Sequence, residues 1–397
     1  MQLNQLSLAV LLCSAPFSVT LAAGLDRSGQ SIAAFLQSGN YAEAGITVID
    51  PDVKGQSIAA LKAEQVSDMA EDYYFPTAAV KIQATEHFSF GLIYDQPFGA
   101  DATYATDTST FSEYHPLTKQ QEGTSVAVKT ENLTALFGYQ PNENWNFYVG
   151  PVWQTVEANI KLRGTAYKNT GYNVKVETEE AYGWLAGFAY QIPEIALNAA
   201  VTYRSEISHD AKSVESTNLP LAALALPAGP LKDFYSSLGY KEDQVNATTP
   251  QSVNIDLQTG IAANTVAFAN LRWVHWDQFT VSPTLLGQLG QDLISYSDDQ
   301  WSANVGIGRK FSEKWSASTL VSYDSGAGNP VTTLGPTEGY WGVGFGAQYS
   351  PTANYFIQGG IRYMWLGDAH AQTGGNVVGE FKDNTAMAYA MKIGYRF

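Results

Sequence analysis

The sequence predicts an all-β fold, a transmembrane antiparallel β-barrel of about fourteen strands. Large apolar residues alternate with small or polar ones along many segments, as in strands that face lipid on one side and a wet lumen on the other. Short turns alternate with long polar segments, and the chain ends on an aromatic residue, Phe397. Both features are typical of bacterial outer-membrane barrels.

The C-terminal segment, residues 386–397, carries the alternation most clearly. The large apolar residues of one parity are Met387, Tyr389, Met391, Ile393, Tyr395 and Phe397. The other parity holds small or charged residues, such as Lys392 and Arg396. A half-buried strand of a soluble β-sandwich shows the same alternation, so this segment alone does not decide between the two folds.

The N-terminal segment predicts export. Residues 6–23 are apolar, end in small residues and are too short for a spanning helix, which is typical of a secretory signal. We expect residues 1–22 to be the signal peptide, although its first five residues lack the usual Lys or Arg. The sole cysteine, Cys13, lies inside this segment, so the mature chain would contain no disulfide.

Composition narrows the class of protein. With 13% aromatic residues, 35 glycines and a formal charge of −16, the chain is too aromatic for a disordered protein. No later stretch approaches ~18 consecutive apolar residues, which excludes a helical membrane protein. No basic patch indicates a nucleic-acid partner. The acidity fits a bacterial surface where divalent cations bridge the protein to outer-membrane lipid and lipopolysaccharide.

Turn-forming residues divide the chain into strands. Short reversals lie at residues 140–144, 191–194, 262–264, 312–314 and 350–354. Longer polar segments lie at 54–72, 100–122, 165–178, 208–250, 277–299, 326–339 and 365–384. We expect the short turns at the periplasmic rim of the barrel and the long segments at the extracellular rim.

The segments between these turns supply the barrel strands, in a domain that we expect over residues 42–397. We place the strands at 42–50, 74–85, 88–98, 126–139, 145–162, 181–190, 195–207, 252–261, 265–276, 301–311, 315–323, 340–349, 355–364 and 386–397. Aromatic residues at strand ends, such as Trp145, Trp273 and Trp315, fit the girdles that mark the two membrane interfaces.

Several segments resemble the long-chain fatty acid transporter (FadL, toluene-transporter) family of outer-membrane proteins. Residues 23–28 (AGLDRS), leading to 45–53 (GITVIDPDV), resemble the first strand of that family and its rim. Residues 201–207 (VTYRSEI) resemble its YRSE strand, which a long loop and a Pro-led strand follow. The strand order of residues 301–397 is also similar, so the resemblance covers nearly the whole mature chain.

The resemblance implies a fourteen-stranded barrel with a small helical plug, or hatch, at its N-terminus. In that family, extracellular loops capture the substrate, an internal pocket binds it, and it leaves sideways through a gap at a kink in the third strand. The ligands implied are long-chain fatty acids or other hydrophobic small molecules. We expect a multi-pass barrel in the outer membrane of a Gram-negative bacterium, acting as a monomer without a cofactor.

The hatch departs from the family pattern. We expect it over residues 23–41, which is shorter than the usual plug, and it lacks the family's Asn-Pro-Ala motif. Its apolar residues at helical spacing are Ile32, Phe35 and Leu36. With Ser28 as N-cap and Gly39 as a stop, the pattern predicts one short helix. Gating by a full hatch is therefore left open.

The long segment 208–250 is unusually apolar between Leu219 and Tyr240. Apolar residues in an extracellular loop are costly unless they are buried or bind something. The candidate ligand contacts are Leu224, Leu226, Phe234 and Leu238. The sequence leaves open whether they form a capture surface or pack within the loop.

Inward-facing cations are candidates for binding a carboxylate in the lumen. Strand parity favours Arg204, Arg272 and Arg362, because the planar fork of arginine binds carboxylates bidentately. Acidic lumen residues such as Asp256 or Asp324 would instead pair with these cations for structural reasons, and both readings remain open.

The third predicted strand contains residues that suit a break. Proline removes a backbone donor and glycine permits a bulge. The candidates for a lateral gate are Gly91, Pro97 and Gly99, and their assignment rests on the resemblance.

No catalytic or metal-binding motif stands out. The five histidines are scattered without ligand spacing, and G-x-S-x-G, H-E-x-x-H and phosphate-loop sequences do not occur. We expect no enzyme, metal or cofactor, with a barrel phospholipase as the remaining enzymatic alternative. The predicted function is passive uptake of hydrophobic molecules. A general diffusion porin for polar solutes and a surface adhesion or receptor barrel remain as alternatives.

Overall fold

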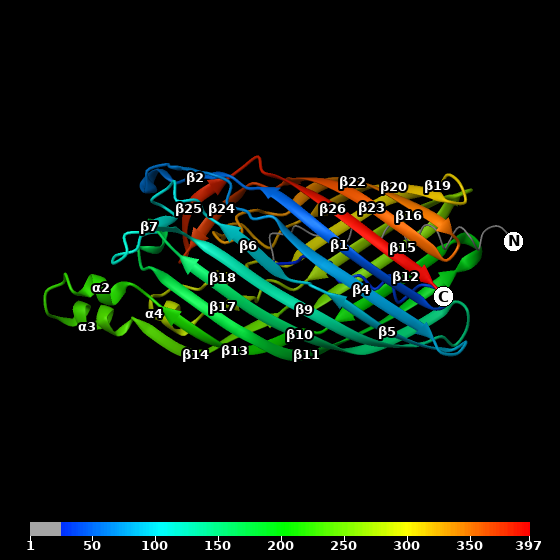
Figure 1. Cartoon of the computed structure of the whole chain (residues 1–397), viewed down its shortest axis with the longest axis horizontal. Coiled ribbons are helices and arrows are strands. Elements are labelled where there is room, and N and C mark those ends of the chain that lie inside the picture. The colour runs from blue at the N-terminus through cyan, green and yellow to red at the C-terminus, as the bar shows by residue number, and fades with distance from the viewer. Residues whose placement is uncertain (1–24) are drawn as a thin grey trace.

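The computed structural model describes residues 25–397, and these residues form a closed antiparallel β-barrel (Figure 1). Within this part of the chain, seventeen strands occupy fourteen wall positions, because three positions consist of two strands in series. In order around the barrel, the wall strands are β1 (Tyr41–Asp52), β4 (Tyr73–Gln83), β5 with β6 (Phe88–Asp95, Gly99–Thr103), β9 (Ser125–Tyr139), β10 (Trp145–Leu162), β11 (Tyr172–Ile192), β12 with β13 (Leu197–Arg204, Ile207–Ser216), β14 with β15 (Tyr240–Thr249, Ser252–Ala262), β16 (Thr265–Val274), β19 (Gln300–Lys310), β20 (Trp315–Asp324), β22 (Tyr340–Thr352), β23 (Tyr355–Leu366) and β26 (Thr385–Arg396). Antiparallel pairing of β1 with β26 closes the cylinder.

The predicted fold class is confirmed. Every predicted strand overlaps one wall position, and the prediction of 145–162 coincides with β10. The strands could be predicted because small inward residues alternate with large outward ones. Along β26, Ala386 and Ala388 are buried while Tyr389 and Met391 are exposed. No helix among the described residues is long and apolar enough to cross a membrane.

Two predicted loops contain long extensions of the barrel strands, which corrects the prediction for 165–178 and 208–250. Strand β11 already begins at Tyr172, and β13 and β14 lie within the second segment. These extensions protrude beyond the membrane, so their outward residues are polar and the apolar alternation disappears. In β13 the buried residues are Ile207, His209, Ala211, Ser213 and Glu215. Buried and exposed residues still alternate with a period of two along β13, although apolar and polar residues no longer do.

Smaller elements fold over the extracellular end of the barrel. The strands are β2 (Gly55–Ser57), β3 (Gln65–Val66), β7 (Ser112–Tyr114), β8 (Gln121–Gly123), β17 (Thr280–Val281), β18 (Ile294–Ser295), β21 (Val331–Thr332), β24 (Ala369–Thr373) and β25 (Asn376–Phe381), and the helices are α2 (Leu219–Ala223), α3 (Pro230–Ser237) and α4 (Thr284–Gln288). Single 3₁₀ turns lie there at Ala59–Leu61 and Thr165–Tyr167, and a third, Pro193–Ile195, forms the short turn between β11 and β12 at the opposite end of the barrel. A large apolar core lies beneath these elements, with Trp276 completely buried.

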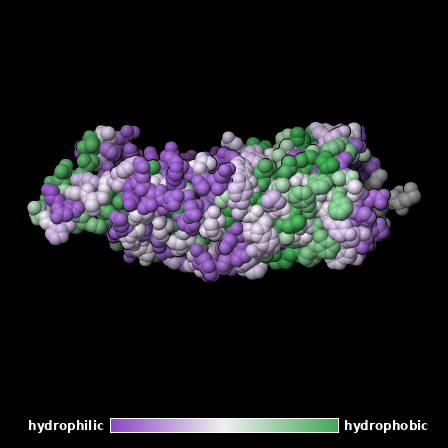
Figure 2. Space-filling view, turned by 90° about the horizontal axis from the view of Figure 1, so that it is seen from below, coloured by the Kyte–Doolittle hydropathy of each residue, from purple (hydrophilic) through white to green (hydrophobic). Residues whose placement is uncertain are grey.

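The outer wall has an apolar belt and a polar extension. Figure 2 shows hydrophobic side chains gathered near the end that carries the C-terminus, while the rest of the wall is mainly hydrophilic. At the outer edge of the belt, large apolar residues lie opposite one another on neighbouring strands. Tyr94 pairs with Leu133, Leu133 with Trp153, and Trp153 with Tyr182. Aromatic residues at this edge are expected where lipid meets water.

The hatch forms turns rather than the short helix predicted between Ser28 and Gly39. Residues 25–40 contain neither helix nor strand, and only isolated bonds such as Phe35 N to Ile32 O resemble a helical turn. The helical spacing is real, since Ile32, Phe35 and Leu36 pack together on the barrel wall. Their backbone forms turns with bonds between residues three apart, and the wall binds carbonyl groups on both sides of this segment, as described below. The predicted signal peptide, residues 1–22, lies outside the described residues.

Candidate functional site

A buried ion pair fixes the hatch to the barrel wall. Arg272 of β16 donates from Nε to Oδ2 of Asp26 over 2.7 Å, and the two side chains are 1% and 0% exposed. The guanidinium also donates to Asn254 and Gln30, so its donors are well satisfied. The sequence predicted an inward Arg272, and its partner is an acid of the hatch rather than Asp256 or Asp324.

Further polar contacts hold the hatch backbone. Arg204 of β12 donates to the carbonyl of Gln30, and Asn254 of β15 donates to that of Gly29 over 2.9 Å. Nearer the periplasmic rim, Lys81 of β4 donates to the carbonyl of Gln37. Because these carbonyl groups bond to the wall, they do not form intrahelical hydrogen bonds. The hatch is therefore shaped by the lumen around it.

The third wall strand is broken between β5 and β6. Asp95 pairs with Asn132 and Gly99 pairs with Lys129, so the broken strand has one residue more than β9 across the same interval. This is a β-bulge, and Pro97, which cannot donate a backbone hydrogen bond, lies within it. The predicted break at Pro97 and Gly99 is present in the structure.

The first hatch residues bind along this break. Asp26 forms an antiparallel bridge with Phe98, Arg27 N donates to Pro97 O over 2.6 Å, and Gly99 N donates to Leu25 O over 2.8 Å. The hatch thus satisfies backbone groups that the interrupted strand leaves without a wall partner. Gly91 lies nearer the periplasmic end of β5, where an added Cβ would lie 2.5 Å from the ring of Phe35.

The break lies beside an unpaired stretch of β4. In the described chain, pairing of β4 with β5 ends at Ala78 and Tyr94, and the next contact is the bridge between Ala70 and Ala102. Residues 73–77 of β4 therefore face the broken strand without ladder hydrogen bonds to it.

Two cavities meet at this interruption of the wall. The inner cavity, about 110 Å³, is lined on its apolar side by Leu25, Val53, Met69, Tyr73, Leu334 and Leu366. The outer recess, about 740 Å³, opens at the outer edge of the apolar belt and is lined by Tyr74, Pro76, Tyr94, Gln96 and Lys129 among others. Both are lined by Arg27, Tyr73, Ala100 and Asp101. These four residues form the partition between lumen and exterior.

The segment with the predicted ligand contacts forms a pair of short helices, α2 and α3, at the far extracellular tip (Figure 1). Leu224 is 75% exposed and Phe234 is 44% exposed, Leu226 is half-buried, and Leu238 is fully buried beneath them. We call the exposed residues Leu224, Leu231 and Phe234, together with Leu226, the tip surface.

Arg362 of β23 is also buried, and its Nη1 lies 3.3 Å from the hydroxyl of Tyr340. Arg204 and Arg272 contact residues 26–30 of the hatch, which brings these two of the three predicted arginines together on one segment.

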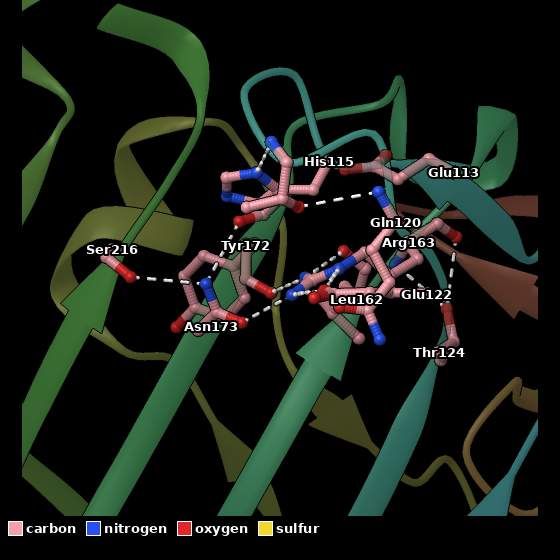
Figure 3. A network of polar contacts seen from close by, with 12 residues as sticks. Glu113, His115, Gln120, Glu122, Thr124, Leu162, Arg163, Tyr172, Asn173 and Ser216 are labelled. Carbon is pink, nitrogen blue, oxygen red and sulfur yellow. Dashed lines mark hydrogen bonds and ion pairs between the residues drawn. The ribbon is translucent and has the colours of Figure 1, made fainter. Parts of the chain in front are cut away.

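A buried arginine organises the extracellular rim near α2. Arg163 donates to Glu122 over 2.8 Å and to the carbonyl groups of Leu162 and Tyr172 (Figure 3). It also donates to Asn173 over 2.6 Å. These contacts tie the hairpin of β7 and β8 to the ends of β10 and β11, so one guanidinium joins three segments of the rim.

One histidine cluster was missed by sequence spacing. His275 Nδ1 lies 2.9 Å from Asp299 and 3.3 Å from Asp277. Trp273 Nε1 also donates to Asp299 over 2.9 Å, at the outer aromatic girdle. These hydrogen bonds account for the cluster as a rim contact between the ends of β16 and β19.

Comparison with known proteins assigns this architecture to a family. The family described as outer membrane protein transport protein (OMPP1/FadL/TodX) matches residues 24–397. The chain belongs to this family. The family resemblance found in the sequence, and the location in the outer membrane that it implies, are thereby confirmed.

Individual members of the family agree with this assignment. The long-chain fatty acid transport protein of Salmonella typhi is 22% identical over 352 residues, covering 81% of this chain and 77% of that protein. A FadL homologue from Pseudomonas aeruginosa has a TM-score of 0.73 at 15% identity, with coverage of 97% and 98%. The toluene transporter TodX of Pseudomonas putida has a TM-score of 0.65 at 13% identity, with coverage of 96% of both chains. These solved structures share the fold.

Sequence reasoning missed two residues of the site. Arg27 and Tyr73 line both cavities, and Arg27 lies 4.1 Å above the Tyr73 ring. Residues 23–28 had been noted for their family resemblance, but strand parity does not apply to an irregular hatch. No pattern in the sequence marks these two residues, because the burial of Arg27 and its contact with Pro97 depend on residues distant in sequence.

Proposed function

We propose that this chain is a passive outer-membrane channel for hydrophobic molecules, with long-chain fatty acids as the first candidate substrate. Membership of the transport family supports the class of function. The observation that carries the proposal on this chain is the pair of cavities on the two sides of the wall, which share Arg27, Tyr73, Ala100 and Asp101. A hydrophobic molecule crossing there would bypass the periplasmic half of the lumen.

Capture begins at the tip surface in this proposal. Leu224, Leu226 and Phe234 contact the substrate, and Leu238 supports them from below. Exposed apolar side chains this far from the membrane bind hydrophobic molecules because contact removes apolar surface from water. The relatives described as transporters of fatty acids and toluene support a hydrophobic cargo.

The lumen then binds the substrate in the inner cavity. Arg204 and Arg272 are engaged by hatch residues 26–30, so they contact a substrate only after that segment moves. Arg362 is a further candidate for binding a polar headgroup, because it lies on β23, whose Leu366 also lines the inner cavity.

Exit is lateral, through the break at Pro97 and Gly99. Gly91 contributes by admitting the Phe35 ring, which holds the hatch against β5. Release of residues 25–27 from the break would open the partition towards the outer recess. In this proposal the channel acts as a monomer embedded in lipid and lipopolysaccharide; the wall closes within one chain, so its closure needs no second copy. It carries out no catalysis.

The test is uptake of radiolabelled oleate by a strain that lacks its own fatty acid channel and expresses this protein. Expression is expected to raise uptake well above the empty-vector rate. The same purified protein in a planar bilayer is expected to pass little ion current, because the hatch occupies the lumen. Large steady currents without oleate uptake would favour the porin and contradict the proposal.

A further inference from the structure

Arg27 is a buried cation without a polar side-chain partner. Its side chain is 7% exposed, yet Nε and Nη2 donate no hydrogen bond within the described chain. No carboxylate of the described residues lies within the 4.0 Å that would make an ion pair with it. The other hatch-region arginine, Arg272, has its donors satisfied. Burying a guanidinium without an ion pair or hydrogen bonds on these donors destabilises the folded protein unless another group binds to it.

The surroundings hold Arg27 in place without neutralising it. Its guanidinium stacks on the Tyr73 ring at 4.1 Å, which is a cation–π contact. On the other side, an added Cβ at Gly99 would lie 2.6 Å from Arg27 Cζ, so only glycine leaves room for the fork. Asp101, which lines both cavities, attracts Arg27 but forms no ion pair with it within 4.0 Å, and because Asp101 is exposed, water screens its charge. The acid beside Arg27 in sequence, Asp26, is already paired with Arg272.

The two free donors form the edge that a carboxylate recognises. Nε–H and one N–H of Nη2 point in the same direction from the guanidinium plane, so they bind two oxygens side by side. A neutral hydrocarbon offers no acceptor for this edge. The inner cavity beside it is lined by Leu25, Met69 and Leu334, which suits an alkyl tail.

We propose that Arg27 is the specificity-determining residue of this channel, binding the carboxylate of an amphiphilic ligand whose alkyl tail lies in the inner cavity. The inference rests on the proposed function and deepens it, because it selects long-chain acids over neutral hydrocarbons of similar size. Since Arg27 also belongs to the partition, the headgroup binds where the lumen meets the outer recess. The competing reading is that Arg27 only fixes Tyr73 and the hatch.

The test compares two ligands that differ in the headgroup alone. Full-length protein in a non-ionic detergent is titrated with oleate and with oleyl alcohol, using wild type, Arg27→Gln, Arg27→Lys and the control Arg309→Gln. Arg309 is exposed on the outer wall, so its replacement removes one positive charge away from the cavities. Folding of each variant is checked by circular dichroism and by heat-modifiable gel mobility.

We expect wild type to bind oleate more tightly than oleyl alcohol. Arg27→Gln is expected to weaken oleate binding by roughly 10- to 100-fold, the range for loss of charged hydrogen bonds. Its affinity for oleyl alcohol should change by less than about twofold. Arg27→Lys should be intermediate because lysine keeps the charge without the fork. Arg309→Gln should match wild type.

Two outcomes overturn the inference, and they are distinguishable. If Arg27→Gln leaves oleate binding unchanged or weakens both ligands equally, Arg27 has a structural role only and the proposed function survives. If wild type binds neither ligand, the proposed function fails together with the inference.

Discussion

Asp26 of the hatch and Arg272 of the barrel wall form an ion pair of 2.7 Å with almost no exposure of either side chain. Two segments far apart in sequence are thereby joined at the centre of the lumen. A pair of this kind is strongly destabilising when only one member is removed, because the other charge remains buried. It is therefore the contact on which the position of the hatch depends.

Replacing one member should release the hatch without unfolding the barrel. We expect Arg272→Met to cost about 3–5 kcal/mol in hatch docking. The measurement is trypsin cleavage after Arg27 in detergent, which should become much faster than in wild type. Arg309→Gln serves as the control. The double variant Asp26→Asn with Arg272→Met should be less disrupted than the single one, and equal cleavage in all variants would contradict the role of the pair.

Deleting Pro97 should close the lateral route. The broken strand has one residue more than β9 between Asp95 and Gly99, so the deletion allows continuous pairing with β9. We expect a folded barrel whose oleate uptake falls by at least about tenfold, since a regular ladder fills the interruption. Uptake is measured in whole cells at matched surface expression. Undiminished uptake by the deletion variant would show that the substrate does not leave through the break.

Polar substitution of the tip surface should impair capture. Leu224→Ser, Leu231→Ser and Phe234→Ser together remove most of its exposed apolar area. Loss of about 1 kcal/mol per contact predicts a drop of roughly tenfold or more in uptake at low oleate concentration. The rate at saturating oleate should change little. A combined variant with the same rate at every concentration would leave the tip surface without a role in uptake.

Acidic pH should strengthen the extracellular loop before β22. Burial and the charge of Asp298 raise the pKa of Glu338 to about 7, although the Gly328 N–H acts in the opposite direction. A carboxyl group with a raised pKa contributes stability that is present below its unfolded pKa and is lost as pH rises through about 7. Hydrogen exchange in residues 326–339, corrected for intrinsic rates, should be at least about threefold slower at pH 5 than at pH 8. Glu338→Gln should flatten this dependence.

Arg163 should be required for order at the rim. Its guanidinium is 5% exposed and bonds to Glu122, Asn173 and two backbone carbonyl groups. Arg163→Met leaves those acceptors unsatisfied, at a cost of about 1–3 kcal/mol each for the buried ones. Protease cleavage within residues 104–124 should accelerate, whereas the exposed control Lys129→Gln should not change it.

The wall was predictable because its pattern is local. Within β10, the outward Trp145, Phe147 and Val149 alternate with inward residues, and the period of two is visible in the sequence. The protruding part of β11 and nearly the whole of β13 were predicted as loops because their outward residues face water and their buried inward residues include polar ones, such as His209, Ser213 and Glu215, so the contrast in hydropathy is lost.

The site was only partly predictable because its contacts are distant in sequence. Strand parity placed Arg272 in the lumen, and the break at Pro97 followed from the chemistry of proline. The partner of Arg272 is separated from it by 246 residues, and Arg27 lies in a hatch without regular structure. No periodic pattern in the sequence predicts either contact.

Pairing of β1 with β26 joins the beginning of the wall to its end, from Tyr41 opposite Arg396 to Asp52 opposite Thr385. The cylinder therefore cannot close until β26 is available to pair with β1. Contacts across this closure join residues as distant in sequence as Glu43 and Lys392, which are 349 residues apart. Closing the wall thus constrains nearly the whole barrel at once, so we expect this pairing to carry the largest loss of chain entropy among the strand pairings.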